Sequence, residues 1–229
     1  MRYVISDIHG KYDLFMRLMD KVGFSDSDTL YVCGDVIDKG EEPIRLLKTV
    51  LGMKNTRMII GNHEKMLLDY YHSLSEREDD FDKILDELRR YVAKDSGMLD
   101  YDILDSLDGL PYYIEESEFI CVHAGIPVLR DGTLAPLSSV PVQYLLNDRR
   151  FKEPSLRHNS EKCVFFGHTQ TNGVCGQYRI LGYLRNKKEK PRVISDFYKI
   201  HLDTGAFCSE TLGCFEMDSL RAFYVCGSP

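Results

Sequence analysis

Six side chains of the kinds that bind metal ions follow short apolar runs in this chain of 229 residues. They are Asp7, His9, Asp35, Asn62, His123 and His168. Carboxylate oxygens combined with imidazole nitrogens suit manganese, iron or zinc better than calcium. Six ligands are too many for one tetrahedral ion, but they suit two ions that share a bridging carboxylate. The ligand set therefore predicts two divalent cations, with manganese favoured and iron or zinc as alternatives.

A pair of such ions indicates hydrolysis of a phosphate ester. Two neighbouring cations make hydroxide available near neutral pH and neutralise charge on the phosphoryl oxygens. The bridging hydroxide attacks phosphorus directly, so no covalent enzyme intermediate is required. The departing alkoxide needs a proton, which a histidine is well suited to give near pH 7.

The elements that position these ligands are predicted by short apolar runs about as long as buried strands. They cover residues 3–5, 30–33, 58–60, 119–122 and 164–166, and each ends at a polar cluster. Amphipathic patterns predict helices over 12–22, 43–51 and most of 64–107. This alternation indicates an α/β architecture with its polar clusters at strand ends. Beyond residue 192, closely spaced antiparallel strands are expected at 193–194, 198–202 and 220–225.

Composition is typical of a folded globular protein, with 43% hydrophobic and 28% charged residues. A net charge of -7 argues against a nucleic-acid binder with a broad basic surface. We find no signal-peptide core and no run approaching the roughly 20 apolar residues of a membrane span. The seven cysteines include no C-x-x-C pair, which favours buried reduced thiols and a cytoplasmic protein. Without a linker or repeat, we expect one domain over 1–229.

Five motifs in this order resemble the calcineurin-like metallophosphoesterases. The motifs are Asp-Ile-His-Gly at 7–10, Gly-Asp-Val-Ile-Asp-Lys-Gly at 34–40, Gly-Asn-His-Glu at 61–64, His-Ala-Gly at 123–125 and Gly-His-Thr at 167–169. Because His-Leu-Asp-Thr-Gly at 201–205 also matches, the resemblance extends to about residue 220. Within the family, the chain looks like the small bacterial and phage serine/threonine protein phosphatases. The resemblance implies a sandwich of two mixed β-sheets flanked by helices, with the metals at one edge. From the apolar pattern we expect the single domain to include a helical segment at about 64–108.

The resemblance also implies how the six ligands are shared. Asp7 and His9 would bind the first metal, and Asp35 would bridge both metals. The remaining ligands, Asn62, His123 and His168, would complete the second site. Wider relatives have Gly-His-x-His at the last motif, where this chain has Gln at the second histidine position. That departure matches the phosphoprotein-phosphatase branch, which does without this ligand.

His63 is implied to be the general acid, with Asp38 as the residue that orients it. His63 adjoins the ligand Asn62, so it lies near the metals without having to bind them. A carboxylate such as Asp38 would hold the imidazole ring and keep it protonated.

Cationic clamps for the phosphate are expected at Lys39 and Arg149. The family usually has Arg at the first position, and lysine keeps the charge but loses the planar, two-pronged grip. At the second clamp, the family usually has Trp before Asp-Arg, whereas this chain has Asn147 before Asp148-Arg149. Arg150 is the alternative to Arg149.

The main interpretation is a metal-dependent hydrolase of phosphoserine and phosphothreonine in proteins. The alternative is a dinucleoside polyphosphate hydrolase that uses the same site. Symmetrically cleaving relatives typically have Gly-Asn-His-Asp where this chain has Gly-Asn-His-Glu, and they lack an acid at the position of Asp38. Glu64 and Asp38 therefore favour the phosphatase. Lys39 favours the dinucleoside polyphosphate hydrolase, because lysine at this position resembles some nucleotidase-like relatives. A third interpretation, an inactive scaffold that binds phosphorylated partners, is disfavoured because all six ligands are present.

The basic stretch 185–192 is expected to be an exposed loop, with contact to acidic substrates as the alternative. His201 is expected to be a strand residue and not a seventh ligand. The sequence leaves the oligomeric state open, and it predicts a phosphoprotein or a phosphorylated small molecule as the substrate, with no nucleic acid and no membrane as partners.

Overall fold

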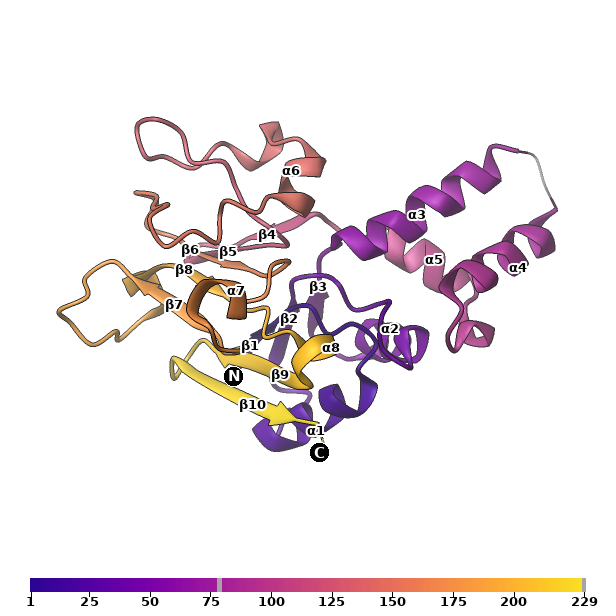
Figure 1. Ribbon diagram of the computed structural model, residues 1–229, viewed down its shortest axis with the longest axis horizontal. Coiled ribbons are helices and arrows are strands. Elements are labelled where there is room, and N and C mark those ends of the chain that lie inside the picture. Colours follow the sequence, from indigo (N-terminus) through magenta and orange to yellow (C-terminus); the bar gives the residue numbers. More distant parts are fainter. Residues whose placement is uncertain (78–79, 228–229) are drawn as a thin grey trace.

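Two five-stranded mixed β-sheets form the centre of the computed structural model, which describes residues 1–77 and 80–227 (Figure 1). The first sheet has the strand order β10-β9-β1-β2-β3 and the second has β4-β5-β6-β8-β7. The strands of the first sheet are β1 (Arg2–Ile5), β2 (Thr29–Val32), β3 (Thr56–Met58), β9 (Thr211–Glu216) and β10 (Arg221–Cys226). Those of the second are β4 (Tyr113–Glu115), β5 (Phe119–Val122), β6 (Cys163–Phe166), β7 (Leu181–Leu184) and β8 (Phe197–His201).

Parallel strands lie side by side in each sheet, and these strands carry the predicted ligands. In the first sheet β1, β2 and β3 are parallel, while β9 and β10 are antiparallel. In the second, β5, β6 and β8 are parallel, and the edge strands β4 and β7 are antiparallel to their neighbours. The predicted sandwich of two mixed sheets flanked by helices is confirmed.

The hydrophobic core between the sheets follows from the two-residue period of the strands. Val4 and Tyr31 pack between the sheets against Phe119 and Phe165 of the second sheet. Their neighbour Ile5, like the other alternate residues of β1 and β2, points to the outer face of the first sheet and packs against helices.

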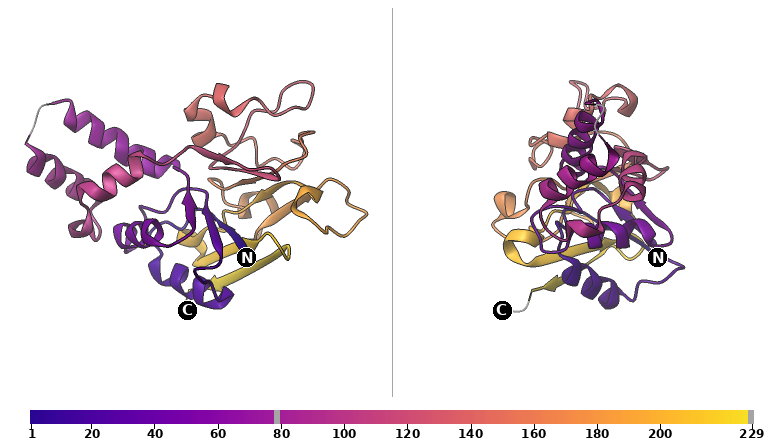
Figure 2. Two further views of the ribbon diagram at one scale, coloured as in Figure 1. Left: turned by 180° about the vertical axis from the view of Figure 1, so that it is seen from behind. Right: turned by 90° about the vertical axis from the view of Figure 1, so that its right-hand side faces the viewer.

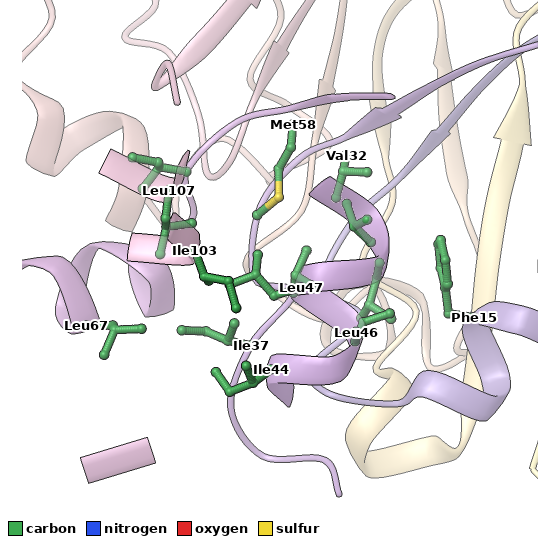
Figure 3. Packing of buried hydrophobic residues seen from close by; sticks show 14 of the residues in the cluster. Phe15, Val32, Ile37, Ile44, Leu46, Leu47, Met58, Leu67, Ile103 and Leu107 are labelled. Carbon is green, nitrogen blue, oxygen red and sulfur yellow. The ribbon is translucent and has the colours of Figure 1, made fainter. Parts of the chain in front are cut away.

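The helices α1 (Tyr12–Val22) and α2 (Pro43–Gly52) connect the parallel strands of the first sheet. Their buried faces pack on that sheet together with residues of the helical segment that follows β3 (Figure 3). The labelled members of this cluster are Phe15, Val32, Ile37, Ile44, Leu46, Leu47, Met58, Leu67, Ile103 and Leu107. The helix predicted over 12–22 has the same bounds in the structure, and the helix predicted over 43–51 is one residue longer.

A helical arm projects away from both sheets (Figures 1 and 2). It consists of α3 (Asn62–Ser75), α4 (Phe81–Val92), the 3-10 turn η1 (Ser96–Met98) and α5 (Tyr101–Asp108). Its helices lie in the segment for which the sequence predicts mainly helix, at about 64–108. The remaining short elements are η2 (Leu137–Ser139), α6 (Val142–Asn147), α7 (Asn172–Cys175), η3 (Ile194–Asp196) and α8 (Ala206–Ser209).

The strand predicted at 193–194 is wrong. The chain turns there because the Asp196 carboxylate accepts hydrogen bonds from the backbone N–H groups of Arg192, at 2.7 Å, and Val193, at 3.1 Å. The strands at 198–202 and 220–225 are confirmed within one residue as β8 and β10, but they lie in different sheets and β8 runs parallel to β6. His201 lies in β8, as predicted, and stacks on Phe166 at 4.4 Å between ring centroids.

All seven cysteines are free, but the expectation that they are buried holds for only four of them. The exposed ones are Cys175, Cys208 and Cys226. Within residues 1–77 and 80–227, no helix is both long and apolar enough to span a lipid bilayer.

Candidate metal centre

The predicted ligands meet where the parallel strands of the two sheets end. Asp7 follows β1, Asp35 follows β2, and Asn62 begins α3 after β3. The second sheet contributes His123 after β5 and His168 after β6. Two ligand sets result: the side-chain atoms of His9, Asp35 and His63 lie within 4.8 Å of one another, as do those of Asp35, His123 and His168. Because Asp35 belongs to both sets, it lies where a bridging carboxylate would have to be.

The backbone at these ligands is held in a conformation that side chains disfavour. Asp7, His9, Asp35 and His168 have φ values of 53°, 50°, 56° and 66°, in the left-handed region. Each such residue costs roughly 1–3 kcal/mol and persists only where the surroundings impose it, which is typical of functional sites. Four of the six predicted ligands are in this state.

Distances between ligand atoms match a shared ion. Asn62 Oδ1 lies 2.9 Å from His123 Nε2 and 2.9 Å from His168 Nδ1. Asp35 Oδ2 lies 3.5 Å from His123 Nε2 and 3.6 Å from the Nε2 atom of His9. Donor atoms at about 2.1 Å from one ion and at right angles to each other are about 3 Å apart.

Two histidines are oriented by backbone carbonyls. His9 Nδ1 donates to the carbonyl of Ile37 at 3.0 Å, and His123 Nδ1 donates to that of Cys33 at 2.8 Å. Each bond leaves the Nε2 atom to face the carboxylate of Asp35. Such outer partners fix the ring and the tautomer of a metal-binding histidine.

The electrostatics of the cluster favour cations. Burial and the charges of Asp7 and Glu64 raise the pKa of the Asp35 carboxyl well above its usual range. Burial lowers the pKa values of His9 and His168 to about 4, so both rings are neutral near pH 7, as metal binding requires. These residues therefore fit a pair of divalent metal ions.

His63 and Asp38 form a pair beside the ligands. His63 Nδ1 and Asp38 Oδ2 are 2.7 Å apart, and the side chain of His63 is 18% exposed. Burial lowers the pKa of His63, but the hydrogen bond to Asp38 and the charge of Asp35 outweigh burial, so that the pKa is raised. The pair has the geometry of a proton donor and the residue that orients it.

Both predicted phosphate clamps, Lys39 and Arg149, line one pocket of about 550 Å³ together with Asp7, His9 and His168. Lys39 Nζ lies 2.8 Å from His9 Nε2. Arg150, the alternative clamp, instead contacts Asp148 and the hydroxyl of Tyr144, at 3.3 and 3.1 Å. The structure thus brings Arg149 to the site and Arg150 to a local surface contact.

The sequence analysis missed the structural role of Glu64. Its side chain is fully buried, and its carboxylate accepts hydrogen bonds from four backbone N–H groups, those of Asp35, Val36, Ile37 and Gly61. A signal was present, because an acid at the third position of a helix often bonds back to the residue that precedes the helix.

A buried carboxyl at Asp203 was missed as well. It lies in the same pocket, is 4% exposed, and accepts a hydrogen bond from Gly205 N at 2.8 Å. Burial and the charge of Asp7 raise the pKa of Asp203 well above its usual range. Asp203 comes two residues after the end of β8, at the sheet edge where the other polar clusters lie.

This chain belongs to the calcineurin-like phosphoesterase family, which matches residues 2–197. The family implies a pair of divalent metal ions.

Relatives that are similar in sequence are named symmetrical bis(5'-nucleosyl)-tetraphosphatases. The protein from Vibrio vulnificus is 29% identical over 152 residues, which are 66% of this chain and 54% of that protein. The one from Delftia acidovorans is 34% identical over 128 residues, which are 54% and 44% of the two chains. The chain thus spans about half the length of the curated relatives that it matches.

Solved structures show the same fold at low sequence identity. One described as a putative diadenosine tetraphosphatase has a TM-score of 0.67 and 18% identity, and covers 99% of this chain and 93% of that chain. A protein serine/threonine phosphatase from Saccharomyces cerevisiae has a TM-score of 0.55 and 15% identity, and covers 100% and 80%.

Proposed function

We propose that this chain hydrolyses dinucleoside polyphosphates symmetrically with a pair of divalent metal ions. The observation that supports the reaction type is the convergence of two ligand sets on Asp35, beside the pair formed by His63 and Asp38. The substrate class is supported by the relatives, which are named symmetrical bis(5'-nucleosyl)-tetraphosphatases. These comparisons favour the alternative of the sequence analysis over its main interpretation, for which the curated relatives give no specific support.

The metal-binding residues in this proposal are those predicted from the sequence. Asp7 and His9 would hold one ion, Asn62, His123 and His168 would hold the other, and Asp35 would serve both. When bound, a metal pair activates water for attack on phosphorus and neutralises charge on the phosphoryl oxygens. We propose manganese as the bound metal, with iron and zinc as the alternatives.

The other side chains bind the phosphate and move the proton. Arg149 and Lys39 line the pocket beside the ligands and bind the phosphoryl oxygens. His63 Nε2 donates a proton to the departing oxygen, and Asp38 holds the opposite ring nitrogen.

Analysis of the reaction products tests the proposal. The manganese-loaded protein is incubated with diadenosine tetraphosphate, and the nucleotides are separated by anion-exchange chromatography. We expect ADP as the only product, and no hydrolysis by the Asp35→Asn variant. Equal amounts of AMP and ATP would contradict symmetrical cleavage, and an intact substrate would contradict the proposed substrate class.

The second candidate is a phosphoprotein phosphatase, and the His63–Asp38 pair is the observation that favours it. An alkoxide leaving from serine or threonine is strongly basic and needs a proton. A leaving nucleoside diphosphate is far less basic, because the corresponding pKa of a phosphate group is about 6. A positioned general acid therefore benefits a phosphoserine substrate more than a dinucleotide.

A further inference from the structure

The pocket that contains three of the predicted metal ligands also has a second wall that carries no ligand. Its volume of about 550 Å³ lies within the roughly 300–1,000 Å³ of small-molecule sites. Its lining includes the predicted ligands Asp7, His9 and His168 and the clamps Lys39 and Arg149. The second wall consists of lining residues that have no part in metal binding: Gln170, Asn172, Gly205, Phe207 and Cys208.

Two turns build this second wall, and hydrogen bonds fix them to each other. The turn after His168 is joined to the turn after β8 because Thr171 N donates to the carbonyl of Asp203 at 2.9 Å. The Gln170 amide nitrogen, 3.2 Å from Cys208 Sγ, makes a second connection between them. The wall is therefore held at a fixed position relative to the metal ligands.

Phe207 is the aromatic residue of this wall. It lies in α8 and is 41% exposed, which leaves a large apolar surface open at the site. Ser209 fixes the short helix by donating to the carbonyls of Thr204 and Gly205, at 3.0 and 2.9 Å. Lys11 Nζ lies 5.7 Å from the ring centroid of Phe207. An exposed aromatic ring on a fixed turn is a stacking surface that needs little reordering on binding.

We infer that Phe207 stacks on a nucleobase of the substrate, and that Gln170 and Asn172 contact the edge of this base. This inference rests on the proposed function. The observation that carries it is that one pocket is lined both by cationic and metal-binding groups suited to phosphate and by an aromatic side chain with two amides. Stacking suits any base, while Asn and Gln amides match the donor and acceptor at N6 and N7 of adenine.

Inhibition measurements test the inference on the full manganese-loaded chain. Hydrolysis of an aryl phosphate is inhibited by ADP or by inorganic phosphate, and the ratio of the two inhibition constants is compared between variants. Loss of base stacking in Phe207→Ala should weaken ADP about tenfold more than phosphate. Phe81→Ala is the matched control, because Phe81 is 71% exposed on the helical arm. An unchanged ratio in Phe207→Ala would overturn the inference.

Direct binding gives a second readout that does not depend on turnover. The chain has no tryptophan, so Phe207→Trp introduces a single tryptophan at the second wall, which can be excited apart from the tyrosines. We expect ADP to quench its fluorescence and pyrophosphate to leave it unchanged. Equal fluorescence changes with ADP and pyrophosphate would show that the second wall responds only to phosphate binding, and would overturn base stacking. An increase in the KM of a phosphothreonine peptide in Phe207→Ala, with ADP unaffected, would assign the wall to peptide side chains and overturn it as well.

The two proposals can fail separately. If the protein prefers a phosphopeptide to diadenosine tetraphosphate, the proposed function fails, and the ADP titration still reports whether a base binds at Phe207. If diadenosine tetraphosphate gives ADP and Phe207→Ala leaves ADP inhibition unchanged, the function stands and the base subsite is overturned.

Discussion

The carboxylate of Glu64 holds the backbone of Asp35, while the carboxylate of Asp35 holds the backbone of His63, the residue before Glu64. The carboxylate of Glu64 accepts a hydrogen bond from Asp35 N at 2.8 Å, and Asp35 Oδ1 accepts one from His63 N at 3.1 Å. These bonds join the loop after β2 to the first turn of α3. They thereby set the position of the predicted bridging ligand relative to His63.

Removing one acceptor oxygen from Glu64 should destabilise the protein strongly. In Glu64→Gln, the amide nitrogen cannot accept hydrogen bonds, and each buried N–H left without a partner costs about 1–3 kcal/mol. We expect the free energy of unfolding in urea to fall by about 3 kcal/mol. Glu76→Gln, at the exposed end of the same helix, is the control and should change it little. Equal effects of the two substitutions would contradict the role of Glu64.

His63→Ala should lower turnover and leave the metal content nearly intact. Loss of a positioned general acid typically reduces the rate about 100- to 10,000-fold, while the six predicted ligands remain. Elemental analysis gives the metal content, and steady-state kinetics with a phosphothreonine peptide or another alkyl phosphate gives the rate. His72→Ala, on the exposed face of the same helix, should retain full activity. Full activity in His63→Ala would remove the general-acid assignment.

Asp35→Asn should impair the binding of both metal ions. The substitution removes the carboxylate charge that both ligand sets share. Elemental analysis after gel filtration should find well below two ions per chain. Asp38→Asn removes a nearby carboxylate that contacts His63 and belongs to neither ligand set, so it should retain both ions. Unchanged stoichiometry in Asp35→Asn would count against the bridging role.

Lys199 should make stability depend on pH in the alkaline range. It is fully buried, with its ammonium group donating to the carbonyls of Glu153 and Leu156 at 2.8 and 3.0 Å. Burial lowers the pKa of Lys199 from 10.5 to about 7. Between these values the unfolded chain binds more protons, so this residue's contribution to the free energy of unfolding rises with pH.

The comparison with Lys199→Met isolates this contribution, because the other titrating groups are common to both proteins. The unfolding free energy of the wild type minus that of the variant should rise from pH 7 to pH 10, by at most about 1.4 kcal/mol per pH unit. Urea denaturation at three pH values measures it. A difference that is constant with pH would show that Lys199 keeps its proton in the folded protein.

The sequence predicted those helices, strand ends and motifs that depend on local residue patterns. The helix at 12–22 has a strong apolar face, and its bounds are confirmed. The strand ends that carry Asp7 and His168 were found because each apolar run stops abruptly at a polar cluster. The family and the two mixed sheets followed from the motifs at these strand ends.

Features that depend on distant partners were not predicted. The strand β7 has only four residues and is defined by its pairing with β8. The hydrogen bonds of Glu64 reach the loop after β2, nearly 30 residues away. The wall that carries Phe207 and Gln170 forms only when two turns from different parts of the chain meet. Whether the chain prefers a nucleotide or a phosphoprotein depends on such surfaces, and the motifs alone favoured the phosphoprotein.

The most direct test of the central claim is a ratio of catalytic efficiencies on one manganese-loaded preparation. The values of kcat/KM are measured for diadenosine tetraphosphate and for a phosphothreonine peptide. We predict a ratio of dinucleotide to peptide well above one. A ratio well below one would contradict the proposed function and identify a phosphoprotein phosphatase built on the same metal site.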